Sequence, residues 1–504
     1  MTAQNPRQHS RTRFLIATVA ASLAALLVGV FVAPQRQVVG PETAGDADLA
    51  AQVRAAADGV GGFRSVAIAE VTPDDITWAG LGNSTAGRSG PAPGADTVFE
   101  TGSVAKTFTA ALFADAIERG EVSPDDPLAQ HLPELEGTPA GEVTLASLAQ
   151  HRSGLPPLGA TAQQRATVAV LTLENPYETT TTEQLIADAT QASVNPEQPP
   201  TYSNFAISLL GTALARTSGH ASWSALLAER ITGPLGMSDT TPMLSADDLP
   251  DGATDPFVFN GTPAPRWYGE GYQPSGTSMA TTIHDMALWA QAQLNGTAPG
   301  GDAPLEPTAE MQGSRIGWAW LTTEIQTTDG EATLVWHNGS SAGHTAMLGI
   351  DPDTDRAVVV LGNTNTPVDT FATAVLHDGP VLGQPMMVTV IGWLLAALAA
   401  ALSGVTLWRA FRGRSVLSVV ALLLISAAGL AYLWHSGPWN AVGGWLWGLA
   451  FAPALAAIPV LALRTALAPK GTTAVPFRPT GSAQVPWLGV ALGVLLIIGV
   501  TQLW

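Results

Sequence analysis

Five long apolar runs stand at the two ends of the chain. One covers residues 14–33, and four more cover residues 386–408, 415–434, 443–463 and 487–504. Each run has about 18 to 23 residues, which is enough for a helix to cross roughly 30 Å of hydrocarbon. The pattern therefore predicts one N-terminal and four C-terminal transmembrane helices.

Between these ends the apolar residues follow shorter periods. Short β-rich runs, separated by turns rich in Gly, Asp, Asn and Pro, cover residues 63–70, 76–81, 318–325, 332–336, 345–350 and 357–361. The segment between the second and third of these runs has mostly helical spacing. We therefore predict an α+β fold in which an antiparallel sheet is assembled from both ends of the block, with a helical insertion in the middle.

Basic residues fix the expected orientation of the spans. They stand before the first run and in two of the connections between the C-terminal runs (Arg7, Arg11 and Arg13; Arg409, Arg412 and Arg414; Arg464, Lys470 and Arg478). By the positive-inside rule these clusters face the cytoplasm, so the block between the runs lies outside the cell membrane. The predicted protein is a multi-pass membrane protein with an extracytoplasmic domain.

The expected organisation has five parts. They are a cytoplasmic N-terminus (1–13), a transmembrane anchor or signal sequence (14–33), a linker (34–58), an extracytoplasmic domain (59–378) and a membrane domain with four helices (386–504). The first run is longer than the roughly 7 to 15 residues of a signal-peptide core, which favours a retained anchor. Cleavage within the run is the alternative.

Composition narrows the chemistry. The chain has 22 Lys and Arg against 41 Asp and Glu, a net charge of −19 that argues against a nucleic-acid partner. It has no cysteine, and its nine histidines are scattered, so we expect neither a thiol nucleophile nor a bound metal or other cofactor. The C-terminal runs carry no Asp, Glu, Lys or Arg in their interiors, which favours an anchor over the alternative of a transporter.

Lys106 is the only lysine in the acidic block, which otherwise uses arginine eleven times. Arginine keeps its proton at useful pH, so a site that needs a neutral amine requires lysine. Ser103 precedes Lys106 by three residues, and the apolar spacing predicts a helix over residues 104–119. The hydroxyl is therefore expected beside the amine, where burial would favour uptake of the serine proton.

Two further segments carry polar side chains at the boundary of a predicted element. Tyr202 and Asn204 lie where an apolar helix begins, and a phenol in such a turn can relay protons. His337 ends a strand just before the small residues Gly339 and Ser340, where a substrate backbone can approach closely. Taken singly, a packed tyrosine in a capping turn and a strand-end histidine explain these residues equally well.

Taken in order, the segments resemble the serine beta-lactamase and penicillin-binding-protein superfamily, and specifically its class C-like branch of carboxypeptidases, esterases and beta-lactamases. The family pattern Ser-X-X-Lys, Tyr-X-Asn and Lys/His-X-Gly is matched by Ser103 and Lys106, Tyr202 and Asn204, and His337 and Gly339. The flanking residues 148–156 and 276–286 also resemble the family. The resemblance covers about residues 60–365 and implies a beta-lactamase-like fold, with an antiparallel sheet flanked by helices and a helical subdomain.

The resemblance also implies an acyl-enzyme mechanism. Ser103 would attack a carbonyl group, while Lys106 and Tyr202 would manage its proton and that of the leaving group. Asn204 would hydrogen-bond Lys106 or the substrate. The backbone N–H groups of Ser103 and Ser340 would form the oxyanion hole.

His337 departs from the pattern of this branch, whose beta-lactamases usually carry lysine there. An imidazole that titrates near neutrality is mostly uncharged at pH 7 and binds a substrate carboxylate weakly. We therefore expect a membrane-anchored serine hydrolase that acts on ester, amide or D-amino-acid peptide substrates, rather than a strong beta-lactamase. Its expected partners are a small molecule or peptidoglycan-like peptide and the lipid bilayer. The alternative is a penicillin-binding or cell-wall-sensing module with little turnover.

Overall fold

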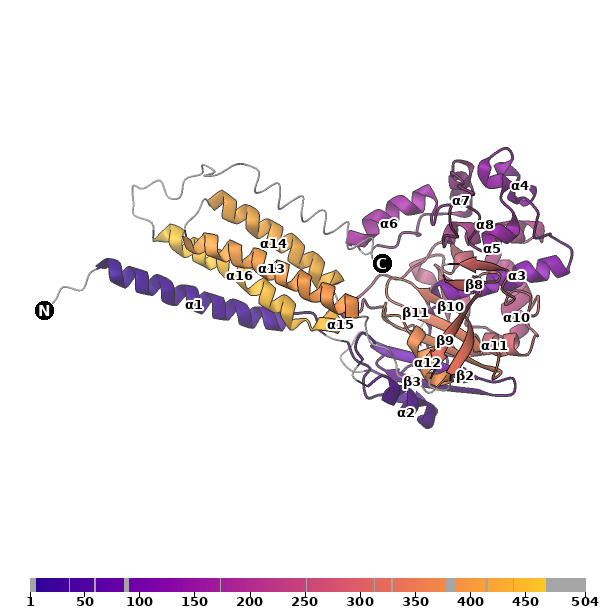
Figure 1. The fold of residues 1–504 in the computed structure, drawn as a ribbon, viewed down its shortest axis with the longest axis horizontal. Coiled ribbons are helices and arrows are strands. Elements are labelled where there is room, and N and C mark those ends of the chain that lie inside the picture. Colours follow the sequence, from indigo (N-terminus) through magenta and orange to yellow (C-terminus); the bar gives the residue numbers. More distant parts are fainter. Residues whose placement is uncertain are drawn as a thin grey trace. The chain divides into compact units, whose positions relative to one another are not determined.

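The computed structural model describes residues 6–35, 37–58, 60–85, 90–172, 174–250, 252–311, 313–327, 330–377, 386–412, 416–437 and 439–467. The chain divides into two compact units (Figure 1). Met1–Arg36 and Gly383–Trp504 form one unit, named the membrane unit after its predicted spans, and Gln37–Leu382 form the other, named the outer unit after its predicted location.

A nine-stranded antiparallel sheet forms the centre of the outer unit, with strand order β1-β3-β2-β12-β11-β10-β9-β8-β7. The strands are β1 (Thr43–Gly45), β2 (Ser65–Val71), β3 (Ile76–Gly82), β7 (Ala309–Met311), β8 (Ser314–Ile316), β9 (Leu321–Thr327), β10 (Gly330–Ser340), β11 (Thr345–Asp351) and β12 (Arg356–Gly362). Strands β2 and β12, from opposite ends of the unit, pair directly. The prediction of an antiparallel sheet built from both ends is confirmed. The strands missing from the prediction, β1, β7 and β8, are too short to give a periodic signal.

Helices are the main regular elements of the segment between the two halves of the sheet. The helices of this unit are α2 (Ala47–Ala56), α3 (Lys106–Glu118), α4 (Leu128–His131), α5 (Leu145–Ala149), α6 (Ala160–Thr172), α7 (Thr182–Thr190), α8 (Asn204–Thr217), α9 (Trp223–Leu227), α10 (Gly233–Leu235), α11 (Ile283–Leu294) and α12 (Asp369–Leu376). A second, three-stranded sheet joins β4 (Phe99–Glu100), β6 (Met279–Thr281) and β5 (Thr241–Pro242). The unit is therefore an α+β domain.

Both faces of the large sheet are covered, as strand β12 shows. Val359 and Leu361 belong to the core that contains the residues of α3 and α11, whereas Val358 and Val360 belong to the core that contains those of α2 and α12. A strand with two buried faces has no polar side to alternate with, which explains why β12 is a continuous apolar run.

Residues 34–58 were expected to form a linker, but they contain β1 and α2. Asp46 caps α2 by accepting a hydrogen bond from the backbone N–H of Leu49 at 2.8 Å. Leu49 and Val53 are buried in the core on the α12 side of the sheet. The segment is therefore part of the outer unit, because its few apolar residues are enough to cover the edge of the sheet.

The membrane unit consists of long apolar helices, α1 (Pro6–Val32), α13 (Met386–Arg412), α14 (Val416–Ser436) and α16 (Trp445–Ala466), with the short α15 (Trp439–Val442). Three segments are long and apolar enough to cross a membrane, namely Thr12–Val32, Thr389–Arg412 and Trp445–Ala466, and Ser418–Trp434 is a shorter apolar helix. The predicted span at 487–504 lies outside the described residues. Four C-terminal spans therefore remain a prediction.

Helix α1 approaches α16 at a pair of glycines. A Cβ atom on Gly29 would lie 2.6 Å from the carbonyl oxygen of Gly448, and one on Gly448 would lie 2.7 Å from that of Gly29. Small residues let transmembrane helices approach this closely. The indole N–H of Trp434 also donates to the carbonyl of Val32 at 2.9 Å. The first helix is therefore packed into the same unit as the C-terminal helices.

Candidate active site

The side chains of Ser103 and Lys106 meet at the start of α3. Ser103 lies in the 3-10 turn η1 (Gly102–Ala105), and Lys106 is the first residue of the helix. The Lys106 Nζ atom lies 2.7 Å from Ser103 Oγ and donates to the carbonyl oxygen of Ser275 at 2.8 Å. The three-residue spacing thus brings an amine against a hydroxyl.

Lys106 is fully buried, with 0% of its surface exposed. Among the described residues, its hydrogen-bond partners are a hydroxyl and a carbonyl rather than a carboxylate. Burial lowers the pKa of Lys106 well below its usual value, because an ammonium group loses its hydration there. The site therefore favours a neutral amine, which can accept a proton.

Tyr202 faces this pair from the turn before α8. Ser203 is the N-cap of that helix, and its extended backbone holds Tyr202 outside the helical turn. The Lys106 Nζ atom lies 4.8 Å from the centre of the Tyr202 ring. Burial raises the pKa of Tyr202, although its hydrogen bond with Ser103 opposes the shift. The phenol is therefore held in its protonated form.

Two histidines flank the Tyr202 ring. The ring centres of His151 and His337 lie 4.4 Å and 6.2 Å from it. The Nδ1 atom of His151 accepts the backbone N–H of Ser203 at 3.2 Å, whereas the Nδ1 atom of His337 lies 2.6 Å from the carbonyl oxygen of Asn338 and must carry a proton to donate to it. The Nε2 atoms of both rings are buried without a hydrogen-bond partner among the described residues.

The expectation that His337 titrates near neutrality is wrong. Burial lowers the pKa of His337 to about 3, and Lys106 adds to this shift when it is protonated. The reason is the alternation of strand β10, in which His337 is 1% exposed while its neighbour Asn338 is exposed. The imidazole therefore stays neutral over the range in which the sequence predicted a change of charge.

Asn204 lies at the first position of α8, but its side chain does not reach Lys106 in the described structure. Its amide nitrogen donates to the hydroxyl of Tyr177 at 3.4 Å, and Lys106 bonds to the carbonyl of Ser275 instead. Tyr177 and Ser275 come from segments between the motifs. Single positions of this kind have no periodicity or spacing by which sequence reasoning could have found them.

Two glycines let the end of β10 touch the nucleophile turn. A Cβ atom on Gly102, whose φ is +50°, would lie 2.5 Å from the backbone nitrogen of Ser340. A Cβ atom on Gly339 would lie 2.7 Å from the backbone nitrogen of Ser103. The backbone nitrogens of Ser103 and Ser340 are thus brought to one junction, where any side chain on either glycine would force the two segments apart.

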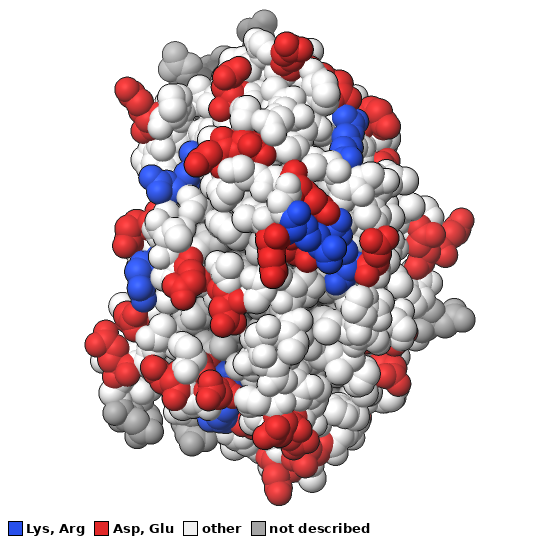
Figure 2. All heavy atoms as spheres, turned by 90° about the vertical axis from the view of Figure 1, so that its right-hand side faces the viewer, with Lys and Arg blue, Asp and Glu red and all other residues white. Residues whose placement is uncertain are grey.

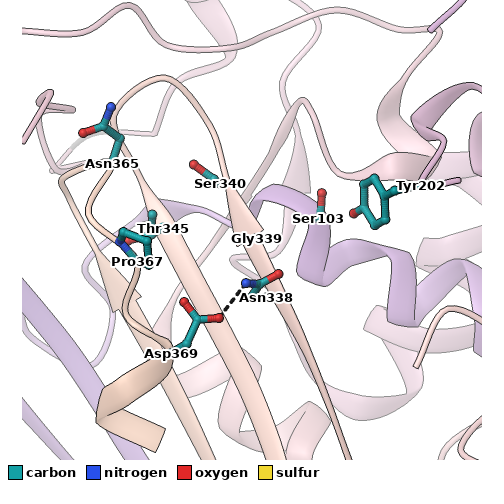
Figure 3. Close-up of a pocket in the computed structure, with 9 residues that line it drawn as sticks. All are labelled: Ser103, Tyr202, Asn338, Gly339, Ser340, Thr345, Asn365, Pro367 and Asp369. Atoms are coloured by element: carbon teal, nitrogen blue, oxygen red, sulfur yellow. Dashed lines mark hydrogen bonds between the residues drawn. The ribbon is translucent and has the colours of Figure 1, made fainter. Parts of the chain in front are cut away.

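A cavity of about 250 Å³ opens beside Ser103. It is lined by Ser103, Tyr202, Asn338, Gly339, Ser340, Thr345, Asn365, Pro367 and Asp369 (Figure 3). Four of these, namely Ser103, Tyr202, Gly339 and Ser340, were predicted site residues. Lys106, Asn204 and His337 are not among the lining residues. Asp369 was missed because it follows the last motif at the start of a short helix, with no pattern around it.

Comparison with known proteins agrees with this geometry. The sequence model of the Beta-lactamase family matches residues 50–378. The chain is 25% identical over 308 residues to a "Beta-lactamase" of Escherichia coli (strain K12), which covers 54% of this chain and 76% of that protein. It is 35% identical over 164 residues to "D-alanyl-D-alanine-carboxypeptidase/endopeptidase AmpH" of the same organism, which covers 31% of this chain but only 39% of that protein.

Solved structures share the fold of the outer unit. A class C beta-lactamase from Rhodobacter sphaeroides has a TM-score of 0.54 at 22% identity, covering 66% of this chain and 98% of that one. The D-alanine carboxypeptidase AmpC from Burkholderia cenocepacia has a TM-score of 0.53 at 23% identity, with 65% and 98% covered. At these identities the solved structures establish the fold alone. Membership of the family follows from the family model, which matches most of the chain. The chain belongs to the beta-lactamase family of serine hydrolases.

Proposed function

We propose that the outer unit is an extracytoplasmic serine hydrolase that acts through an acyl-enzyme on Ser103, with ester, amide or D-amino-acid peptide substrates. The observation that carries the proposal is the 2.7 Å distance between Ser103 Oγ and the buried Lys106 Nζ. A serine hydroxyl is a weak nucleophile unless a base takes its proton, and a neutral amine at this distance is such a base.

Acylation then follows from the contacts. Ser103 Oγ attacks the substrate carbonyl carbon while its proton passes to Lys106, and the C–O bond forms. The negative charge on the carbonyl oxygen is stabilised by the backbone N–H groups of Ser103 and Ser340, which meet at the glycine junction.

Tyr202 is suited to the second half of acylation. Its raised pKa keeps the phenol protonated, and its hydrogen bond with Ser103 places it at the reacting atoms. It gives its proton to the leaving group as the scissile bond breaks, and Lys106 restores that proton to the phenol. Water then attacks the acyl-enzyme, releasing the acid and regenerating Ser103.

The proposal also includes the membrane anchor. The contact between Gly29 and Gly448 supports a first helix that is retained, because a cleaved signal sequence would leave α16 without this partner. Together with the basic clusters at the N-terminal end of α1 and around the C-terminal ends of α13 and α16, it supports a multi-pass protein whose catalytic unit lies outside the cytoplasm.

We expect a fluorescent fluorophosphonate to label the full-length protein at Ser103, with loss of fluoride. Ser103→Ala removes the nucleophile and should abolish labelling. Lys106→Arg keeps a cation where a neutral amine is needed, so the labelling rate should fall by about 10² to 10⁴-fold. The matched control is Lys470→Arg, the same change at the other lysine of the chain. Labelling of Lys106→Arg at the wild-type rate would show that Lys106 is not the base.

Turnover of p-nitrophenyl butyrate distinguishes the hydrolase from the alternative sensing module. A single burst of p-nitrophenol without steady turnover would favour the sensing module.

The pH dependence of hydrolysis follows from the direction of the pKa shifts. For a neutral ester, kcat/KM should rise with pH as Lys106 loses its proton, and the rise should lie below the ordinary lysine pKa of about 10.4. His337, with a pKa of about 3, should add no step between pH 5.5 and 8. A step in that range that disappears in His337→Gln would show that the histidine is the titrating base.

The absence of cysteine from the sequence allows a direct test of topology. In intact cells, Thr179→Cys on the exposed surface of the outer unit should react with a membrane-impermeant maleimide. Thr2→Cys should react only after the membrane is permeabilised. A cysteine added after Trp504 should react from outside if all four C-terminal runs cross the membrane. Labelling of Thr2→Cys in intact cells would contradict the proposed orientation.

A further inference from the structure

The cavity beside Ser103 contains one carboxylate and no basic side chain. Among its nine lining residues, Asp369 is the acid, and Lys, Arg and His are absent from that set. Ser103 and Tyr202 lie on one side of strand β10, whereas Asp369, Pro367 and Asn365 lie on the other (Figure 3). The carboxylate therefore faces the part of a substrate that extends away from the reacting bond.

Asn338 adds a second acceptor to the same wall. Its amide nitrogen donates to Asp369 Oδ1 at 2.5 Å. This hydrogen bond fixes the orientation of the amide, so the Asn338 oxygen points to the opposite side, toward Ser103 and Tyr202 (Figure 3). Asn338 and Asp369 together present oxygen atoms to the cavity, and one of the two N–H groups of the Asn338 amide is used by Asp369.

Lys106 and His337, which do not line the cavity, do not supply a compensating positive charge. Burial favours the neutral amine of Lys106, and His337 is neutral above a pKa of about 3. Burial raises the pKa of Asp369, an effect that its hydrogen bond with Asn338 opposes. A carboxylate placed at the Asp369 end would lose its hydration beside a second acid, whereas an ammonium group would favour the ionised form of Asp369 and gain a charge-assisted hydrogen bond.

We propose that Asp369 is a specificity-determining residue, and that the site takes esters or amides whose portion beside Asp369 carries an ammonium group rather than a carboxylate. The inference deepens the proposed hydrolase function and rests on it. It predicts that substrates with a free carboxylate at this position, such as penicillins and peptides ending in D-alanine, are poor ligands.

A simpler account is that Asp369 serves α12 alone. It is the first residue of that helix, where a negative charge interacts favourably with the helix dipole, and it pairs with Asn338. This account predicts a loss of stability on replacement but no change in the preference for charged ligands. The preference between ligands is therefore the quantity to measure.

Three boronic acids separate the two accounts, because Ser103 Oγ can add to boron and so report on the reaction site. They are phenylboronic acid, 3-(aminomethyl)phenylboronic acid and 3-carboxyphenylboronic acid, measured as inhibition constants with the full-length protein. The inhibition constant of the ammonium compound for wild type should be at least about tenfold lower than that of the carboxylate compound. The reason is that a hydrogen bond to a charged group changes affinity by about a factor of ten relative to a neutral one. In Asp369→Asn this ratio should fall toward one, and in Asp369→Lys it should reverse.

Distant acids also repel anions, because Asp and Glu are spread across the face of the protein drawn in Figure 2. Measurement at 0.15 M salt screens charges beyond about 8 Å. Asp353→Asn, which removes one exposed charge from the β11–β12 turn outside the cavity, is the matched control and should keep the wild-type ratio.

The outcomes distinguish the two proposals. If phenylboronic acid fails to bind wild type, the serine hydrolase site itself is wrong. If it binds, but the carboxylate compound binds wild type as tightly as the ammonium compound, the role of Asp369 is overturned. An unchanged ratio in Asp369→Asn would also overturn it. If Asp369→Asn does not fold, Asp369→Glu, which keeps the charge, and the wild-type ratio still decide the question.

Discussion

The candidate site depends on one buried amine. Lys106 is fully enclosed, and its neighbours among the described residues offer a hydroxyl and a carbonyl instead of a carboxylate. Taking a charged ammonium group out of water without an opposite charge is costly, so the interior favours the deprotonated form. The same apolar surroundings that stabilise α3 and α8 thereby leave a neutral amine, the proposed base, beside Ser103, so the core and the proposed chemistry share one cause.

The sheet supplies the other half of the site through its alternation. Strand β10 points His337 inward, toward Tyr202, and turns Asn338 outward to the cavity. These two neighbouring residues therefore face opposite sides of the strand, His337 the interior and Asn338 the cavity. The glycines at 102 and 339 bring this strand against the nucleophile turn although more than 200 residues separate them in the sequence. This contact is possible because strands from the N-terminal and the C-terminal parts of the unit pair in one sheet.

Periodicity and motif spacing were sufficient for the sheet, the helical insertion and the meeting of Ser103 with Lys106. They failed where a property depends on burial or on a single contact. The pKa of His337 follows from its place on the inner face of β10, and the hydrogen bond of Asn204 follows from Tyr177, a residue in no motif. Asp369 reaches the cavity because α12 packs on the face of the sheet against β11 and β12, a contact that no local sequence pattern records. Residues 34–58 were misread because β1 and α2 are short.

The charge of Lys106 at neutral pH tests the account most directly. In the full-length Lys470→Arg variant, Lys106 is the only lysine of the chain, so selective ¹³Cε labelling of lysine gives one NMR signal to follow with pH. The account predicts a titration midpoint well below the ordinary value of about 10.4, with the neutral amine present near pH 7. A midpoint at or above about 10.4 would show a protonated ammonium beside Ser103, and would contradict the assignment of Lys106 as the base.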